Sequence, residues 1–178
     1  MTARERALIT AYRGRGGEME ETPDKVSTLL DAKRVLDALR VQHALIGGVA
    51  VGVHSGVPRA TLDVDVAVLS TCDRSVIARA MTEAGFRLVG EHAHSANFRH
   101  PSGEPVQLAF DPAFAAMIER AETFEVAGAR VDVVRKDDLI AMKRRAASDP
   151  GRRRSKALRD QADIALLLGD VPDPDEGW

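Results

Sequence analysis

The stretch LIGGVAVGVHSGVPRATLDVDVAVL, residues 45–69, decides the fold of this chain. It opens with a short apolar run that ends at Gly47 and Gly48, and the residues that follow predict a short helix over 49–54. Glycines between a strand and a helix let a phosphate approach the backbone, and the helix start offers free N–H groups and positive potential. Gly47 and Gly48 therefore predict an anion-binding helix start.

The second half of the stretch alternates between apolar and polar residues from Leu62 to Leu69, which predicts a strand. Asp63 and Asp65 project from the same face of this strand, so their carboxylates can share a divalent cation. Mg²⁺ prefers one or two carboxylates together with phosphate oxygens. An isolated Asp-x-Asp is more often a solvated face, but the glycine pair upstream favours a metal–nucleotide site. Arg59 and Thr61 could add phosphate contacts, although Arg59 is equally well explained as an ordinary loop arginine.

The rest of the chain mixes helices and strands without a regular βαβ repeat, which indicates the α+β class. We expect one domain over residues 24–170, with a mixed β-sheet packed by helices and two C-terminal helices. A flexible lead-in over 1–23 and a frayed tail over 171–178 should flank it. Helices are predicted over about 24–42, 73–84, 112–120, 136–148 and 155–168, and strands over about 86–89, 96–100, 106–110, 124–126 and 130–134.

Composition excludes several classes of function. The 178 residues are 44% hydrophobic but only 4% aromatic, so the core must be mainly aliphatic. A net charge of −2 gives no general attraction to nucleic acid or acidic membranes. Cys72 is the only cysteine, which excludes an internal disulfide and a cysteine zinc cluster. No apolar run approaches the roughly 20 residues of a membrane span, and the first residues lack a signal-peptide pattern. We therefore expect a soluble, cytoplasmic protein.

The quoted stretch resembles the signature of the nucleotidyltransferase superfamily with a DNA-polymerase-β-like fold. It is particularly similar to the small bacterial branch that includes the AbiEii-type toxins and aminoglycoside- or lincosamide-modifying enzymes. The segments DLIAMK, residues 138–143, and KALRDQADI, residues 156–164, are similar to the closing motifs of the AbiEii branch. The resemblance covers about residues 44–168 and therefore most of the predicted domain.

The resemblance implies transfer of a nucleoside monophosphate from a nucleoside triphosphate to an acceptor, with Mg²⁺ or Mn²⁺. In such a site Asp63 and Asp65 hold the metal, and Gly47 and Gly48 bind the triphosphate. The acceptor is left open between RNA, a protein and a small molecule, and an antitoxin is a further partner that the resemblance suggests. No membrane is implied.

A third carboxylate, on a later strand, usually completes the site in this family. By position it falls on Gln107, and an amide cannot act as a general base. Asp111 lies on the same face of a regular strand, but about 13 Å further along it. Asp132 is the other candidate, and we give Asp111 the lead as the third catalytic acid. The alternative is that both are surface acids, in a catalytically weak or inactive nucleotide-binding or toxin–antitoxin interaction module.

Lys143 lies in the apolar stripe of the next-to-last predicted helix, so it must reach out to solvent or meet an anion. A triphosphate contact and an aliphatic stem that covers the core both explain it. On the last helix, Lys156–Asp160 and Arg159–Asp163 have the spacing of surface ion pairs, which are worth a few tenths of a kcal/mol each. The resemblance would instead let Asp160 or Asp163 orient Lys143 or a substrate group, which places Asp160 with the nucleotide-binding residues.

The densest positive patch of the sequence is Arg152-Arg153-Arg154, with Lys156 nearby. Such a patch could bind RNA through its phosphates. No aromatic residues are interleaved to stack on bases, and a solvated loop between two helices explains the patch more simply.

Overall fold

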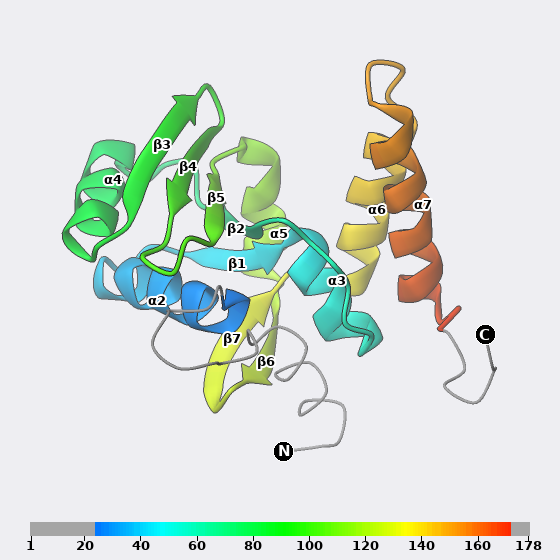
Figure 1. Cartoon of the computed structure of the whole chain (residues 1–178), viewed down its shortest axis with the longest axis horizontal. Helices are drawn as coiled ribbons and strands as arrows, with labels where there is room; N and C mark the ends of the chain where they lie inside the picture. The colour runs from blue at the N-terminus through cyan, green and yellow to red at the C-terminus, as the bar shows by residue number, and fades with distance from the viewer. Residues whose placement is uncertain (1–23, 172–178) are drawn as a thin grey trace.

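The computed structural model describes residues 24–171, which form a mixed seven-stranded sheet with helices around it (Figure 1). The strand order is β3-β4-β5-β2-β1-β7-β6. β2 is parallel to β5 and β1 is parallel to β7, whereas the other neighbouring pairs are antiparallel. The strands are β1 (His43–Ile46), β2 (Val64–Val68), β3 (Arg87–His92), β4 (Ser95–Arg99), β5 (Pro105–Ala109), β6 (Glu122–Val126) and β7 (Ala129–Val133).

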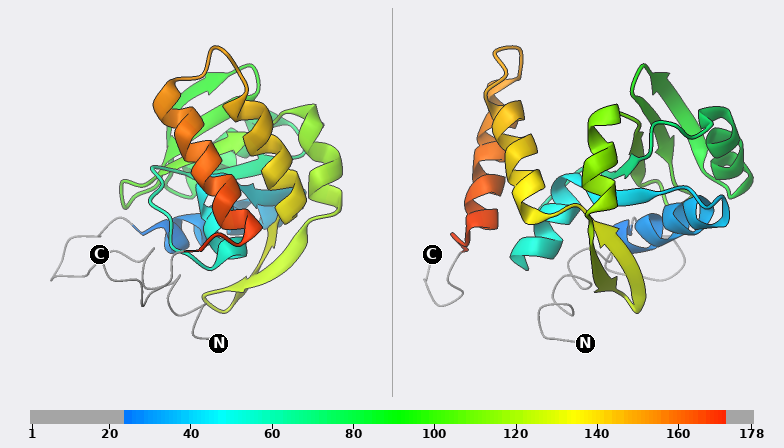
Figure 2. Two further views of the ribbon diagram at one scale, coloured as in Figure 1. Left: turned by 90° about the vertical axis from the view of Figure 1, so that its right-hand side faces the viewer. Right: turned by 180° about the vertical axis from the view of Figure 1, so that it is seen from behind.

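Six α-helices accompany the sheet within the described residues, and the last two form a hairpin that packs on α3. This hairpin stands to one side of the sheet, far from the β3 edge (Figures 1 and 2). The α+β class and the C-terminal helices are thereby confirmed. The helices are α2 (Lys25–Ala38), α3 (Gly47–Ser55), α4 (Arg74–Glu83), α5 (Ala115–Glu119), α6 (Lys136–Ala147) and α7 (Arg154–Leu168), and a 3₁₀ turn, η1 (Pro112–Phe114), precedes α5.

The helix starts follow from capping side chains. Asp24 accepts a hydrogen bond from the backbone N–H of Val26, and Asp73 caps α4 in the same way. The first helix ends at Ala38, earlier than the residue near 42 that the sequence predicts. Arg40 adopts a left-handed conformation with φ 55°, and such a residue terminates a helix.

The core lies between the sheet and helices α2 and α4, and it is mainly aliphatic, as the composition predicts. The central strands β1 and β2 are buried along almost their whole length, which makes them a rigid support for the residues at their ends. The largest fully buried side chains are Phe86, Phe98, Leu36, Leu45, Ile77, Met81, Leu108 and Leu139.

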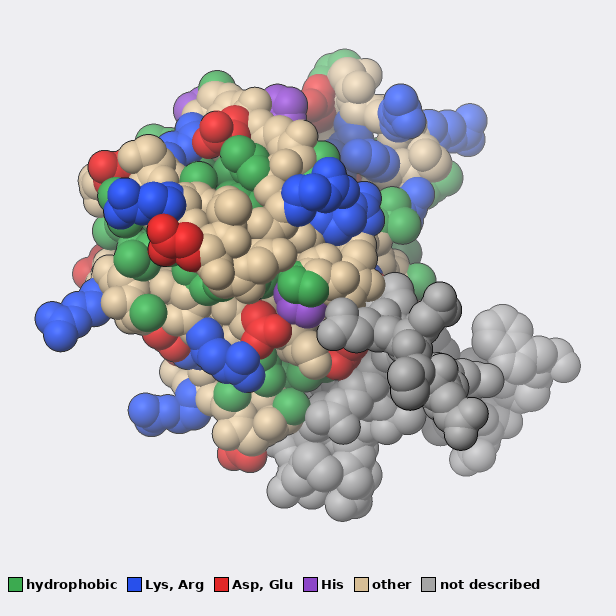
Figure 3. Space-filling view, turned by 60° about the vertical axis from the view of Figure 1, so that its left-hand side comes forward, with side chains coloured by type: hydrophobic (Ala, Val, Ile, Leu, Met, Phe, Trp, Pro, Cys, Tyr) green, Lys and Arg blue, Asp and Glu red, His purple; other side chains and the backbone are tan. Residues whose placement is uncertain are grey.

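Surface charges are distributed rather than gathered on the face that Figure 3 shows, where basic and acidic side chains are interspersed. No helix among residues 24–171 is long and apolar enough to cross a membrane. The expected lead-in, residues 1–23, and residues 172–178 of the expected tail lie outside the described residues.

Candidate functional site

The end of β1 and the start of β2 bring Gly47 and Asp65 together. The two strands are antiparallel, and Ile46 is paired in register with Asp65. Gly47 follows directly as the first residue of α3 and has φ +71°. A Cβ atom on Gly47 would lie 2.8 Å from the Cγ of Asp65 and would overlap its Oδ2. Only glycine therefore fits here, both for its backbone conformation and for its contact with the carboxylate.

Gly48 is in close contact with the residues that precede β2. A Cβ atom on Gly48 would lie 2.5 Å from Arg59 Nη1 and 2.7 Å from Thr61 Oγ1. The loop after α3 thus returns across the N-terminal end of that helix. The structure brings together Gly47, Gly48, Arg59 and Thr61, which the sequence places in one candidate phosphate site.

Asp65 carries a carboxyl group that is largely shielded from water, so its ionised form is disfavoured. Burial, and secondly the negative charge of Asp63, raise the pKa of Asp65 to about 7. The positive charges of Lys143, Arg59 and Lys156 act in the opposite direction. Asp63 itself lies one residue before β2, because the strand starts at Val64 rather than at Leu62. Two interacting carboxylates are therefore set among basic groups from three other segments.

The strand beside β2 presents an amide next to this carboxylate pair. β5 is parallel to β2, and the residue in register with Asp65 is Gln107. Among residues 24–171, no set of three His, Cys, Asp or Glu side chains is grouped to bind a metal ion. The residues present thus offer two carboxylates and no third acidic ligand.

The two acids considered as a third carboxylate lie elsewhere. β5 ends at Ala109, and the Asp111 side chain caps η1 by accepting a hydrogen bond of 2.9 Å from Ala113 N. The prediction that Asp111 completes the site therefore has no support from its position.

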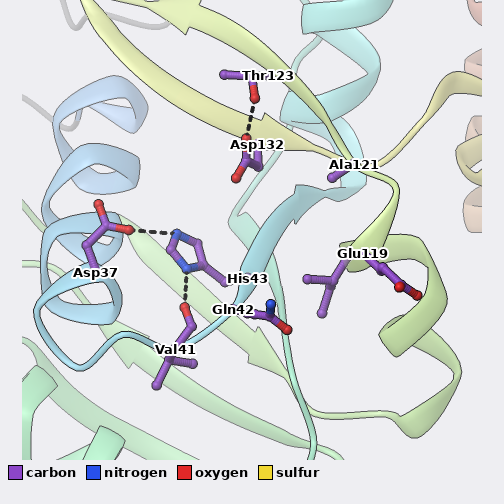
Figure 4. A pocket seen from close by; sticks show the side chains of 9 residues that line it. Asp37, Val41, Gln42, His43, Glu119, Ala121, Thr123 and Asp132 are labelled. Carbon is purple, nitrogen blue, oxygen red and sulfur yellow. Dashed lines mark hydrogen bonds and ion pairs between the residues drawn. The ribbon is translucent and has the colours of Figure 1, made fainter.

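Asp132 is just as poorly placed to complete the site. It accepts a hydrogen bond of 2.7 Å from Thr123 and lines a separate cavity with Asp37 and His43 (Figure 4). That cavity adjoins the first residue of β1, at the other end of the strand from Gly47. Asp132 is therefore no better a candidate than Asp111 for the third carboxylate.

Lys143 meets two buried anions, so it is not merely an aliphatic cover for the core. Its Nζ donates to Asp160 Oδ1 at 3.1 Å and forms an ion pair with Asp163 Oδ2 at 2.8 Å. Both aspartate side chains are almost fully buried, at 2% and 1% exposure. The expectation that Asp160 or Asp163 orients Lys143 fits this geometry.

The surface ion pairs expected on the last helix are replaced by longer-range ones. Asp163 pairs with Arg59 and Asp160 pairs with Arg152, whose Nε lies 2.5 Å from Asp160 Oδ2. The two aspartates face α6 and α3 rather than solvent, so they cannot pair with exposed residues on their own helix. Arg152 is likewise not a free member of a basic RNA-binding patch.

The Arg59–Asp163 pair links the loop before β2 to the last helix. It joins residues 104 positions apart, so no local pattern could reveal it. The only signal in the sequence is that Asp160 and Asp163 are three residues apart on α7, which places them on one face. Through Asp163, the position of Arg59 against Gly48 depends on how α7 packs.

Comparisons with known proteins point to a nucleotidyltransferase. The model of the family described as "Nucleotidyl transferase AbiEii toxin, Type IV TA system" matches residues 28–176. No protein among those with curated functions matches the sequence.

Among solved structures, the lincosamide antibiotic adenylyltransferase LnuA, in its lincomycin-bound form, is 13% identical with a TM-score of 0.58, covering 82% of this chain and 97% of that one. The antibiotic-resistance factor ANT(2'')-Ia is 18% identical with a TM-score of 0.59, covering 82% and 84%. An antigenic nucleotidyltransferase-like protein from Paracoccidioides brasiliensis is 24% identical with a TM-score of 0.56, covering 87% and 81%. At these identities the similarity shows the fold, which is the nucleotidyltransferase fold expected from the sequence.

Replacing Gly47 with alanine should lower the free energy of unfolding by more than about 2 kcal/mol. The left-handed conformation alone costs an L-residue about 1–2 kcal/mol, and the overlap with Asp65 adds to it. Urea unfolding measures the change. Gly90→Ala is the control, because its Cβ would meet nothing within 4 Å. Equal stability of the two variants would refute the close contact.

The pH dependence of stability should change when Asp65 is replaced with asparagine. The unfolded chain releases the Asp65 proton near its ordinary pKa of 3.8, whereas the folded protein holds it to about pH 7. Stability from the protonated group is therefore complete below pH 3.8 and is lost as the pH rises towards 7. In thermal unfolding with EDTA, the advantage of Asp65→Asn over wild type should grow from pH 4.5 to pH 8. An advantage that is constant with pH, as expected for the exposed control Asp132→Asn, would contradict the burial of this charge.

Asp163→Asn should reduce the free energy of unfolding by about 3 kcal/mol, because it leaves two partly buried cations, Arg59 and Lys143, without their shared anion. Arg159→Gln, on the solvent side of the same helix, should change it by less than about 0.5 kcal/mol. Denaturant unfolding compares the two variants directly. A larger effect of Arg159→Gln would restore the surface ion-pair interpretation of Asp163.

Proposed function

The chain belongs to the AbiEii family of nucleotidyl transferases, and from this premise we propose that it transfers a nucleoside monophosphate from a nucleoside triphosphate to an acceptor. The observation that carries the proposal is the contact between Gly47 and Asp65. It sets the free N–H groups at the start of α3 beside the half-buried carboxylates of Asp63 and Asp65. An anion site and a cation site that adjoin are what a metal-bound triphosphate requires.

The residues at this site fit Mg²⁺ or Mn²⁺. Asp63 and Asp65 supply two carboxylates, and Mg²⁺ is commonly held by one or two carboxylates, with substrate phosphates and water completing its shell. The high pKa of Asp65 means that its negative charge needs a compensating positive charge. When bound, the cation would neutralise charge that develops on the phosphates during transfer.

The residues of the chain itself would bind and orient the triphosphate. Gly47 and Gly48 admit phosphate oxygens to the helix start, and Arg59 and Thr61 lie against Gly48 where they can add contacts. Lys143, held by Asp160 and Asp163, offers a cation whose charge already acts on Asp65. These contacts align the α-phosphorus for attack by an acceptor oxygen, while the bond to the leaving pyrophosphate breaks.

The proton of the acceptor hydroxyl would pass to water, since Gln107 cannot accept it as a base. Transfer of this kind depends mainly on positioning and charge neutralisation, so a site without a third carboxylate can still be active. Gln107 nevertheless favours a second candidate function, a weakly active or inactive nucleotide-binding module of the same fold. The toxin–antitoxin description of the family supports an antitoxin as a partner in either case.

The acceptor class is the remaining part of the proposal. The similar structures include one of LnuA bound to lincomycin and one of ANT(2'')-Ia in complex with adenylyl-2''-tobramycin. Both support a small-molecule acceptor for this chain, with RNA as the alternative.

Isothermal titration with a non-hydrolysable nucleoside triphosphate tests the site. Wild type should bind at least about tenfold more tightly with Mg²⁺ than without it, a difference of about 1.4 kcal/mol. The double variant Asp63→Asn/Asp65→Asn should lose this Mg²⁺-dependent gain, whereas the exposed control Asp132→Asn should keep it. Unchanged Mg²⁺-dependent binding by the double variant would reject the site. Pyrophosphate release by wild type that disappears in Asp63→Asn would eliminate the inactive-module alternative.

A further inference from the structure

A cavity of about 720 Å³ opens between the η1–α5 segment and helix α6, which lie side by side in Figure 2. Its size is within the range of small-molecule binding sites. Half-buried apolar side chains form its walls, and ionisable side chains lie among them. The apolar residues are Phe114, Met117 and Met142, and the ionisable ones are Asp111, Arg145 and Asp149.

Both walls of this α5–α6 cavity continue elements that line the candidate site. β5 carries Gln107 beside Asp65 and leads directly into Asp111 and η1. Helix α6 carries Lys143, and the adjacent Met142 lines the cavity. Asp111 follows Gln107 by four residues, so the Cα atoms of the two residues lie at most about 14 Å apart. One elongated small molecule could therefore reach from the cavity to the nucleotide.

Asp111 gives the α5–α6 cavity an excess of negative charge. Of the ionisable side chains around the cavity, Arg145 is on the last turn of α6 and Asp149 follows that helix, so with Asp111 the cavity carries one positive and two negative groups. The Asp111 Oδ1 atom accepts from Ala113 N, and within residues 24–171 its Oδ2 atom has no hydrogen-bond partner. One carboxylate oxygen is thus available at the edge of an apolar cavity, which complements a cationic group on an apolar body.

We propose that the α5–α6 cavity binds the acceptor, and that the acceptor is a small molecule with an apolar body and a protonated amine. That the bound molecule acts as an acceptor rests on the proposed function. The amine pairs with Asp111, the apolar body packs against Phe114 and Met142, and a hydroxyl group of the same molecule extends towards Asp65. Asp111 is then a residue that binds the acceptor, not the third carboxylate of the metal site.

A binding experiment without nucleotide tests the cavity separately from catalysis. The full-length protein is titrated with 4-phenylbutylamine, with the neutral 4-phenylbutanol and with the anionic 4-phenylbutanoate, and chemical shifts are followed by NMR. The amine should bind saturably, the alcohol about fivefold more weakly and the carboxylate weakest, because a partly exposed ion pair contributes about that factor. Equal binding of all three probes, or no binding of the amine, would overturn the proposal.

Two variants locate the bound amine. Asp111→Asn should remove the preference for the amine over the alcohol while keeping the fold, because asparagine also caps a helix start. Ala141→Trp replaces an exposed alanine of the cavity wall and should block all three probes. Asp132→Asn, an acid in a different cavity, should leave binding unchanged. Amine binding that survives both Asp111→Asn and Ala141→Trp would place the probe elsewhere and refute the assignment.

The acceptor role is tested by incubating labelled triphosphates with extract of the source cells. Ala141→Trp should retain Mg²⁺-dependent triphosphate binding but lose the labelled small-molecule product that wild type forms. Labelled RNA that is unaffected by Ala141→Trp would overturn the acceptor assignment. A failure of the proposed function differs from both results, because Mg²⁺-dependent triphosphate binding would then be absent from wild type itself.

Discussion

The structure of the site depends on one steric constraint, the contact of the Gly47 backbone with the Asp65 carboxylate. It requires a glycine with positive φ, a helix that begins directly after β1, and a half-buried acid on the neighbouring strand. Each of these features costs stability on its own, through the backbone entropy of glycine and the desolvation of the carboxylate. Their occurrence at one point supports the proposed metal-bound triphosphate, which needs both free N–H donors and negative charge.

A second set of interactions connects this point to the C-terminal helices. Asp160 and Asp163 are buried on α7, and together they pair with Lys143, Arg59 and Arg152. Buried ion pairs contribute little net stability, but the loss of one partner is costly. The network therefore acts mainly on geometry, since it holds one cation from α6 and one from the loop before β2 near the same carboxylates. The arrangement of the proposed nucleotide site therefore depends on how α6 and α7 pack on α3.

Elements with a strong local pattern are predictable from this sequence. The expected strand forms around Asp65, and the expected helices begin after the capping residues Asp24 and Asp73. These elements are predictable because backbone preference and side-chain periodicity act over a few residues. Less predictable are points where one residue overrides the pattern. Arg40 ends the first helix before residue 42, where the sequence predicts its end.

Residue types and short spacings by themselves determined the α+β class, the glycine pair at a helix start and the acidic pair on the next strand. They also showed that the position expected for a third carboxylate holds an amide, Gln107. Only the tertiary structure decided which side chains meet. It turned Asp163 towards Arg59 instead of Arg159 and placed Asp111 at a cavity between α5 and α6 rather than beside Asp65. The reason is physical: local structure follows from neighbours along the chain, whereas burial of charge and contact across 104 positions follow from how helices pack on the sheet.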